Sequence, residues 1–458
     1  MPTDKVQTPS DTYNALIDDW NLVGALWGGT KAMRVAGRTY LPQEPAESDE
    51  AYEIRLERSV LFNALKRTIR TLAGKPFSRP VGLGEGTDSM LLAWLDDVDL
   101  QGTDLDTFAR DCFEAAVRDG VSYILVDFPK TDDEMTLADE QSAGVRPYLV
   151  NIDCRQVIGW QTAAVGGRER LVQVRIREDS VIAAGDFGEA VSERIRVLEP
   201  GSFRVFERVV NDDQVTDWLL VDEGSTPGMA DIPLVPVYTH RTGFMQATPP
   251  LRDLAHLNVE HWQSSSDQSN ILHYARVPLL LASGFGEGDL FEIGPNRVIQ
   301  HPDTQANLSY VEHSGRAIEA GRVSISDIQD RMRVMGLELM VGQRTGSMTA
   351  TERALDQAQF DSELAGMVRG LESSLENALG LMGAWAGMAD VTDGVDIHQD
   401  FGISLRDVSD VDSLLKSRAA GDLSQATFLA ELKRRGLLMA SLEVEDEREL
   451  IAAEAPAL

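Results

Sequence analysis

The sequence predicts an α+β fold, and three changes of pattern along the chain support this prediction. Amphipathic helical segments come first and extend to about residue 118. Short, β-branched and often alternating segments follow between residues 146 and 238, which is typical of a meandering antiparallel sheet or a small barrel. Helical periodicity returns from about residue 250 and dominates the rest of the chain.

The N-terminal part predicts two amphipathic helices. Apolar residues recur at spacings of three and four from Thr12 to Trp27, and two glycines follow as a helix stop. A second run extends from Asp49 to Ala73, with Ser48 as its N-cap. The apolar stripes within residues 16–27 and 54–72 serve either as intrachain core or as a contact surface, and the core is the default interpretation.

The middle of the chain predicts two shorter helices, over residues 89–96 and 104–118, and then a buried strand from Val121 to Phe128. The polar stretch over residues 131–145 is expected to be a loop. After the sheet region, a helix over residues 251–274 has the polar middle HWQSSSDQSN. Such a helix is not a simple core helix, because many of its kind line a channel or bridge two bodies.

Later segments alternate between short strands and helices. Short strands are expected within residues 276–310, and a helix from about residue 317 to 339. A Gly- and Thr-rich stretch from Val341 to Ala350 precedes the longest helical pattern, which extends to about residue 388. One strand within VDIHQDFGISL and two closing helices, over residues 411–419 and 424–435, complete the prediction.

The charge of the chain is its most unusual compositional property. It has 458 residues with 74 acids and 42 bases, which gives a formal net charge of −32. Ordinary nucleic-acid binding depends on basic patches that release counterions, so this charge argues against it. Two interpretations remain open: a soluble acidic protein, or a protein that handles DNA without gripping it, because a negative wall repels phosphates.

Known chemical motifs are missing from the sequence. The only Gly-Lys pair is followed by proline, so there is no phosphate-binding loop, and the histidines lack metal-site spacing. Cys112 and Cys154 are expected to be small core residues. We therefore predict no catalytic residue, no cofactor and no metal. Arg331, Arg333 and residues 433–435 are interpreted as solvated faces or helix ends. The sequence shows neither a signal-peptide pattern nor an apolar run that predicts a membrane span.

Four strings carry a family resemblance. They are WNLVGALWGG from Trp20, YEIRLERSVLFNALKRTIRTLAGKPF from Tyr52, PPLRDLAHLNVEHWQSSSD from Pro249, and TATE from Thr349. Together they resemble a portal-like family of tailed phages and prophages over roughly residues 10–390. The strings are specific to the family rather than to any chemical motif.

The resemblance implies the architecture of a portal subunit. It places a wing at residues 1–250, with a β-rich part at 121–240, and returns to the wing at 351–408. Between them it implies a first stem helix at 251–275, a small α/β clip at 276–314, a second stem helix at 315–340 and a tunnel loop at 341–350. A short helical crown would cover residues 409–458.

The resemblance also implies a structural role rather than an enzymatic one. A portal is a dodecameric ring at the unique capsid vertex, which provides the channel for genome packaging and ejection. Its partners would be identical subunits, double-stranded DNA, the major capsid protein, the terminase and a head–tail adaptor, with assembly in the host cytoplasm and a final place in the virion. Gln343, Arg344, Thr345 and Ser347 would project into the channel and touch DNA loosely.

Two other functions stay open at this point. The first is another ring-forming or scaffold-like head protein without a DNA channel, and the second is an enzyme whose site follows no known motif. A small insert between two helices, followed by a glycine-rich loop, favours the portal over the first alternative. A screen for ATP hydrolysis and nuclease activity addresses the second.

Overall fold

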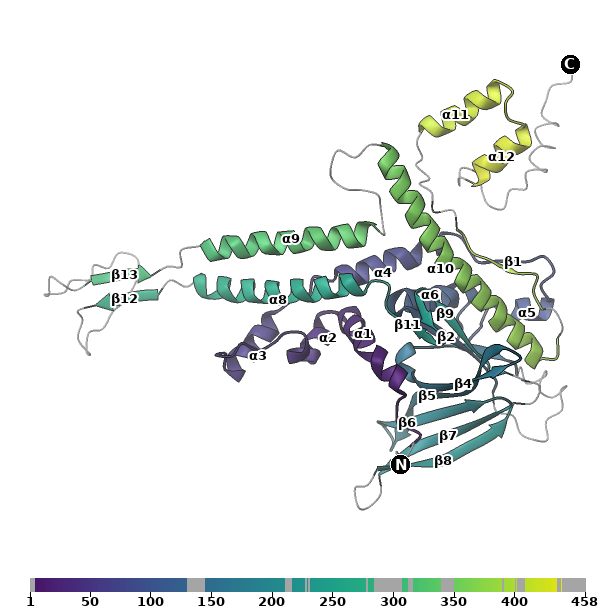
Figure 1. Cartoon of the computed structure of the whole chain (residues 1–458), viewed down its shortest axis with the longest axis horizontal. Coiled ribbons are helices and arrows are strands. Elements are labelled where there is room, and N and C mark those ends of the chain that lie inside the picture. Colours follow the sequence, from purple (N-terminus) through teal and green to yellow (C-terminus); the bar gives the residue numbers. More distant parts are fainter. Residues whose placement is uncertain are drawn as a thin grey trace. The chain divides into compact units, whose positions relative to one another are not determined.

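The computed structural model describes residues 5–129, 145–210, 216–226, 229, 231–276, 279–283, 307–311, 316–338, 350–388, 391–399, 401, 408–434 and 438. The chain divides into two compact units, residues 1–399 and 400–458, which are described separately. Residues 131–144 of the loop predicted over 131–145 and residues 341–349 of the predicted tunnel loop lie outside the described residues. Figure 1 shows the elements in sequence colours.

The first unit mixes helices with antiparallel sheets, as an α+β fold requires. Its helices are α1 (Asp11–Trp27), α2 (Gly29–Ala36), α3 (Asp49–Arg58), α4 (Ala64–Gly74), α5 (Ser89–Trp94), α6 (Leu105–Asp119), α8 (Arg252–Ala275), α9 (Arg316–Glu338) and α10 (Ala350–Trp385). Short 3-10 turns lie at Gly37–Thr39, Pro76–Ser78 and Cys154–Gln156.

The strands among the described residues fall into five sheets. They are β1 (Gly82–Leu83), β2 (Val121–Asp127), β3 (Tyr148–Ile152), β4 (Val157–Val165), β5 (Arg168–Ala184), β6 (Gly188–Glu199), β7 (Ser202–Val210), β8 (Thr216–Ser225), β9 (Leu234–Tyr238), β10 (Arg241–Gly243), β11 (Gln246–Ala247), β12 (Leu279–Ser283), β13 (Asn307–Val311) and β14 (Val395–Asp396).

The predicted single helix over residues 49–73 is wrong, because the chain leaves the helical conformation between α3 and α4. Ser59 has extended torsions, and Asn63 caps α4 by accepting a hydrogen bond from Lys66 N at 2.9 Å. Residues distant in sequence stabilise the break: Leu61 N donates to Thr30 Oγ1 at 3.1 Å, and the Arg34 guanidinium donates to the Ser59 carbonyl at 2.9 Å. Tertiary hydrogen bonds thus replace helical ones here.

The other N-terminal predictions fare better. The expected helix from Thr12 is α1, which starts one residue earlier with Ser10 as its cap. Its stripe is core, since Leu16, Trp20 and Val23 are buried. The second stripe is also core from Leu61 to Leu72, whereas its first member, Ile54, is 41% exposed. The sequence did not predict α2, because only one of its eight residues is buried and no apolar stripe results.

Two sheets form the β-rich part. The sheet β3-β2-β9 has β2 in its centre, antiparallel to both neighbours. The second sheet, β4-β5-β6-β7-β8, pairs every strand with the next one in sequence, so the predicted antiparallel meander is confirmed. In the described part of the chain β4 and β8 are its edges, and the alternative of a closed barrel does not occur.

The core lies between these two sheets and extends to α1. One face of β2, with Val121, Tyr123 and Leu125, packs with inward residues of β4 to β7. Tyr13, Leu16 and Trp20 of α1 belong to the same cluster. Because successive side chains of a strand alternate between faces, Ser122 points the other way and donates to the Cys112 carbonyl of α6 at 2.8 Å. β2 is therefore covered on both faces.

Helices α6 and α10 supply contacts on that second face. Asp104 caps α6 by accepting from Thr107 N at 2.7 Å, and Gly120 ends it with φ 90°. A Cβ at Gly120 would lie 2.2 Å from the Thr248 carbonyl oxygen, so no larger residue fits. α10 packs against β9, and its Ser374 hydroxyl donates to the Pro236 carbonyl at 3.0 Å.

The buried apolar side chains in the described part of α10 recur at spacings of three and four, and they are Leu364, Val368, Leu371, Leu375, Ala378, Leu379 and Met382. This is the long helix that the sequence predicted from Thr349. In the described part of the predicted strand VDIHQDFGISL, Val395 and Asp396 pair with β1, and residues 400 and 402–405 lie outside the described residues. In the described residues no helix is both long and apolar enough to cross a bilayer.

The second unit contains α11 (Val408–Ala419) and α12 (Gln425–Arg434), close to the two closing helices that the sequence predicted. Residues 420–424 separate them, and the Ser424 hydroxyl caps α12 by accepting from Thr427 N at 3.1 Å. Leu429 is buried within this unit.

Candidate functional site

The predicted DNA-contacting residues Gln343, Arg344, Thr345 and Ser347 lie outside the described residues, so their role stays a prediction. The structure describes two other basic residues that the sequence singled out, Arg331 and Arg333. Arg331 pairs with Glu260 at 2.8 Å, and Arg333 pairs with Asp330 at 2.8 Å. Both arginine side chains are 55% exposed, so these are solvated pairs that contribute little stability.

The first candidate surface is the hairpin of α8 and α9. These two helices contact each other extensively, and the strands β12 and β13 that follow α8 and precede α9 pair antiparallel. Figure 1 shows α8 and α9 side by side along their lengths. Within the described residues the order of elements is therefore helix, two paired strands and helix.

A polar seam joins the two helices. His261 is buried, its Nδ1 lies 3.3 Å from Ser265 Oγ and its Nε2 lies 3.0 Å from Gln329 Nε2 of α9. Gln268 Nε2 donates to the Ile318 carbonyl at 2.9 Å. Burial lowers the pKa of His261. Some polar residues in the middle of α8 thus form hydrogen bonds to α9 within the subunit, and others remain exposed to solvent.

Polar side chains also fix α8 to the N-terminal helices. Asn258 is fully buried, its Oδ1 accepts from Leu65 N at 3.0 Å and its Nδ2 donates to the Phe62 carbonyl at 2.9 Å. The Ser59 hydroxyl donates to Ser266 Oγ at 2.8 Å. The two bonds of Asn258 use backbone groups that lie at the break between α3 and α4.

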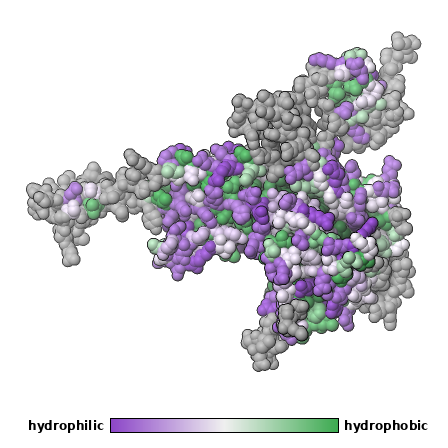
Figure 2. All heavy atoms as spheres, viewed as in Figure 1, coloured by the Kyte–Doolittle hydropathy of each residue, from purple (hydrophilic) through white to green (hydrophobic). Residues whose placement is uncertain are grey.

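The outer half of the hairpin buries almost nothing within the subunit. On α9 the buried positions are Ile328, Met332 and Gly336, a single narrow stripe. Among residues 318–327 and the described side chains of 267–276, none is buried. Figure 2 shows hydrophobic spheres interspersed among hydrophilic ones along this hairpin. A helix pair so exposed is incomplete as a folded core.

A cluster of two acids and a cysteine brings together groups that could bind a metal ion. Ligand atoms of Asp119, Asp153 and Cys154 lie within 4.8 Å of one another. Both carboxylates are already paired: Arg155 lies 2.7 Å from Asp119 and 2.9 Å from Asp153, and Arg118 lies 2.5 Å from each. Two guanidinium groups leave little negative charge for a cation.

The proton state of this cluster agrees with a structural role. Burial raises the pKa of the Cys154 thiol well above its usual range, which disfavours the thiolate that a metal requires. Burial alone would raise the pKa of Asp153, but Arg155 and Arg118 lower it below its ordinary value. Trp20 Nε1 donates to the Asp119 carbonyl at 3.0 Å. The network therefore attaches α1 to the sheet.

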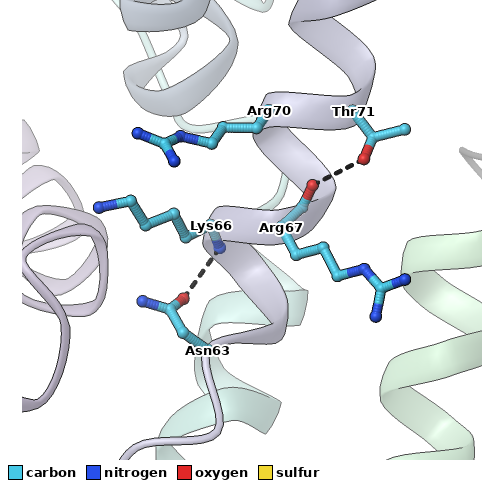
Figure 3. Close-up of a pocket in the computed structure, with 5 residues that line it drawn as sticks. All are labelled: Asn63, Lys66, Arg67, Arg70 and Thr71. Carbon is cyan, nitrogen blue, oxygen red and sulfur yellow. Dashed lines mark hydrogen bonds between the residues drawn. The ribbon is translucent and has the colours of Figure 1, made fainter.

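The second candidate surface is a shallow basic groove on α4, with a cavity volume of about 430 Å³. Asn63, Lys66, Arg67, Arg70 and Thr71 line it. In Figure 3 Lys66 and Arg70 extend to the same side of the helix, and Arg67 extends to the other. The spacings of three and four place all five residues on the solvent face of α4.

Trp27 organises one side of this groove. The Lys66 ammonium lies 4.8 Å from the centre of its ring, and the Arg70 and Arg118 guanidinium groups each lie 5.7 Å away. Lys66 Nζ also donates to the Trp27 carbonyl at 3.0 Å. Cation–π contacts at the surface are worth about 0.5–1 kcal/mol each, so the ring holds the cations in place.

This groove was not predicted from the sequence, although the distribution of acidic and basic residues along the chain indicates it. Residues 44–57 contain six acids and one base, and residues 58–84 contain six bases and no acid. In a chain with a net charge of −32, such separation of charge into neighbouring segments is unusual. The search for phosphate-binding and metal motifs does not detect it, because it has no fixed residue spacing.

Comparisons with known proteins give three results. Residues 250–386 match the model of a domain of unknown function (DUF4055), a span that runs from the start of α8 to the end of α10. No curated protein matches the chain. The match to the domain of unknown function covers a minority of the chain, and its description names no activity.

Two solved structures resemble the chain distantly. One is from the "virion of native gene transfer agent (GTA) particle", with a TM-score of 0.42, 11% identity, and coverage of 80% of this chain and 87% of that chain. The other is from the "neck of empty GTA particle", with a TM-score of 0.42, 12% identity, and coverage of 81% and 88%. Likenesses at this level leave the function open.

Proposed function

We propose that the chain is a portal subunit of a tailed-phage particle, a structural protein that forms a ring around a DNA channel. The observation that carries the proposal is the hairpin of α8 and α9. It consists of two long helices with a pair of strands between them, and the long helix α10 follows after residues 339–349. This is the order that the family strings imply for stem, clip, stem, tunnel loop and wing helix.

The exposure of the hairpin supports assembly. Its outer half buries no described side chain within the subunit, yet Val323 is 47% exposed and Ile271 is 37% exposed. Helices that lie side by side in a ring would cover such residues with the helices of the neighbouring subunit. The seam between α8 and α9 then remains inside each subunit, and the outer faces supply the contacts between subunits.

The proposed mechanism is mechanical rather than chemical. The ring would replace one capsid vertex, dock the terminase during filling, and later dock a head–tail adaptor. An acidic channel would repel DNA phosphates and let the duplex slide, because like charges prevent tight binding. Arg344 and its neighbours in residues 343–347 would contact DNA lightly and centre it.

Mass determination and negative-stain imaging of the purified chain test the proposal. We expect closed rings with a central hole and a mass near that of a dodecamer. A chain that stays monomeric or dimeric at high concentration contradicts the proposal. In that case a screen for ATP hydrolysis and nuclease activity is the next experiment, since an enzyme was the alternative that the sequence left open.

A further inference from the structure

Two exposed helix faces in the N-terminal part carry opposite charge. On α3, Glu50, Glu53, Ile54 and Glu57 are all exposed, and their spacing of three, one and three residues places them on one stripe. On α4 the corresponding stripe is the basic groove. The first face presents three carboxylates around an apolar residue, whereas the second presents three cations.

Neither face is neutralised by its own subunit. In the described part of the chain Glu50, Glu53 and Glu57 form no ion pair, and the side chain of Arg67 has no hydrogen-bond or ion-pair partner. Arg70 lies 4.0 Å from Glu114 and stays 63% exposed. By contrast, the buried Arg55 of α3 is fully paired, with Glu47 at 2.8 Å. Apart from Arg70, the charged residues of the two stripes therefore have no ion-pair partner within the described part of the subunit.

We propose that α3 of one copy packs its acidic face against the basic face of α4 on the next copy. The inference rests on the proposed function, because it needs a ring of identical subunits. A basic face cannot pair with itself, so the contact joins two different surfaces of the chain. Such head-to-tail contacts generate rings when the rotation closes. Complementary charges on helix faces select partner and orientation.

Both faces are held rigidly, as a contact between copies requires. The break between α3 and α4 is fixed by the bond of Ser59 to Ser266 and by both amide atoms of Asn258. The angle between the two helices is therefore set by α8. The fixed angle between the acidic face of α3 and the basic face of α4 decides whether successive copies close into a ring.

A second copy fits the basic face better than nucleic acid does. The net charge of −32 repels a polyanion from the subunit as a whole, whereas every copy offers its own α3. Ile54, which is 41% exposed, gives the acidic face an apolar centre that a phosphate backbone would not use. Binding of duplex DNA to α4 is accordingly an outcome of the test that overturns the proposal.

Two double variants reverse the charge of one face each. The first carries Arg67→Glu and Arg70→Glu, and the second carries Glu50→Arg and Glu53→Arg. All four side chains are exposed, so the variants should fold, which circular dichroism verifies. Arg168→Glu with Arg170→Glu on the five-stranded sheet is the matched control for the first variant, because it adds the same negative charge.

The decisive experiment measures ring formation of each variant alone and of an equimolar mixture. Each variant alone should require at least about tenfold more protein for half-maximal assembly than the wild type, because like charges then face each other. The mixture should assemble like the wild type, since alternating copies restore both pairings. The sheet control should assemble like the wild type as well.

The outcomes separate this inference from the proposed function. If the wild type forms rings and both variants form them equally well, the inference fails and the proposed function stands. The inference also fails if the mixture does not recover, or if the first variant loses only binding to a short DNA duplex. A wild type that forms no ring at any concentration overturns both proposals.

Discussion

Two regions of the molecule are stabilised by different kinds of contact. One is the body, which consists of the sheets β3-β2-β9 and β4-β5-β6-β7-β8 together with α1, and the other is the hairpin of α8 and α9. In the body, apolar side chains fill the space between two sheets and α1, and the buried carboxylate Asp119 is paired with two arginines. In the hairpin, Asn258 and His261 lie among the buried residues, and the outer half contributes no described buried side chain.

This difference separates what the subunit stabilises alone from what it offers to neighbours. Burial of apolar area is the main source of folding stability, and the body has a contiguous core that supplies it. The hairpin has a narrow stripe and relies on directional hydrogen bonds at its base. Hydrogen bonds specify a geometry more than they add stability, so the base of the hairpin is suited to set an angle.

The largest effect is expected from breaking the charge network in the body. Asp119 is 1% exposed and faces both Arg155 and Arg118. Asp119→Asn leaves two guanidinium groups with one carboxylate, which should lower the free energy of unfolding by about 3 kcal/mol. Urea unfolding followed by circular dichroism measures it.

A matched control for this variant lies on α9. Glu319→Gln breaks the pair with Arg322, in which both side chains are well exposed, and should leave the urea midpoint unchanged. If Asp119→Asn is equally silent, the network does not stabilise the body, and the metal interpretation of the acids and Cys154 regains weight.

A smaller effect is expected at the base of the hairpin. Asn258→Ala removes the acceptor of the buried Leu65 N and one of the two donors to the Phe62 carbonyl, which should cost about 2 kcal/mol because a buried N–H loses its bond. Asn258→Asp keeps the acceptor for Leu65 N and should cost less, unless the buried charge outweighs it. Equal stability of Asn258→Ala and the wild type would show that the seam adds no local stability.

The sequence predicted best where periodicity is strong and local. The amphipathic run of α1, the alternating strands β4 to β8 and the long α10 each follow from spacing alone, because apolar positions face one core. The break between α3 and α4 could not be predicted. It depends on Thr30, Arg34 and Asn258, whose positions relative to Ser59 exist only in the folded chain.

The candidate sites divide in the same way. The hairpin follows from helical periodicity and from the family strings, and the structure describes it closely to the expected bounds. The basic groove on α4 has no motif, since its residues share only charge and a common helix face. Helical periodicity is recognised by its apolar stripe. The basic stripe of α4 and the acidic stripe of α3 contain few apolar residues, so neither was predicted.

The smallest predicted effect is a pH dependence that belongs to the hairpin alone. Burial lowers the pKa of His261 below the ordinary value of 6.5, so the unfolded chain binds a proton at a higher pH than the folded one does. The stability contribution of the neutral ring is therefore full above pH 6.5 and is lost as the pH falls through that value.

His261→Gln removes the titration but keeps a polar side chain in the seam. The difference in unfolding free energy between wild type and His261→Gln, measured from pH 7.5 to 5.5, should shrink toward acid pH in favour of the variant. Carboxylates elsewhere titrate in both proteins and cancel in this difference. A difference that stays constant with pH would mean that the ring is solvated in solution, and that the polar seam opens in the isolated subunit.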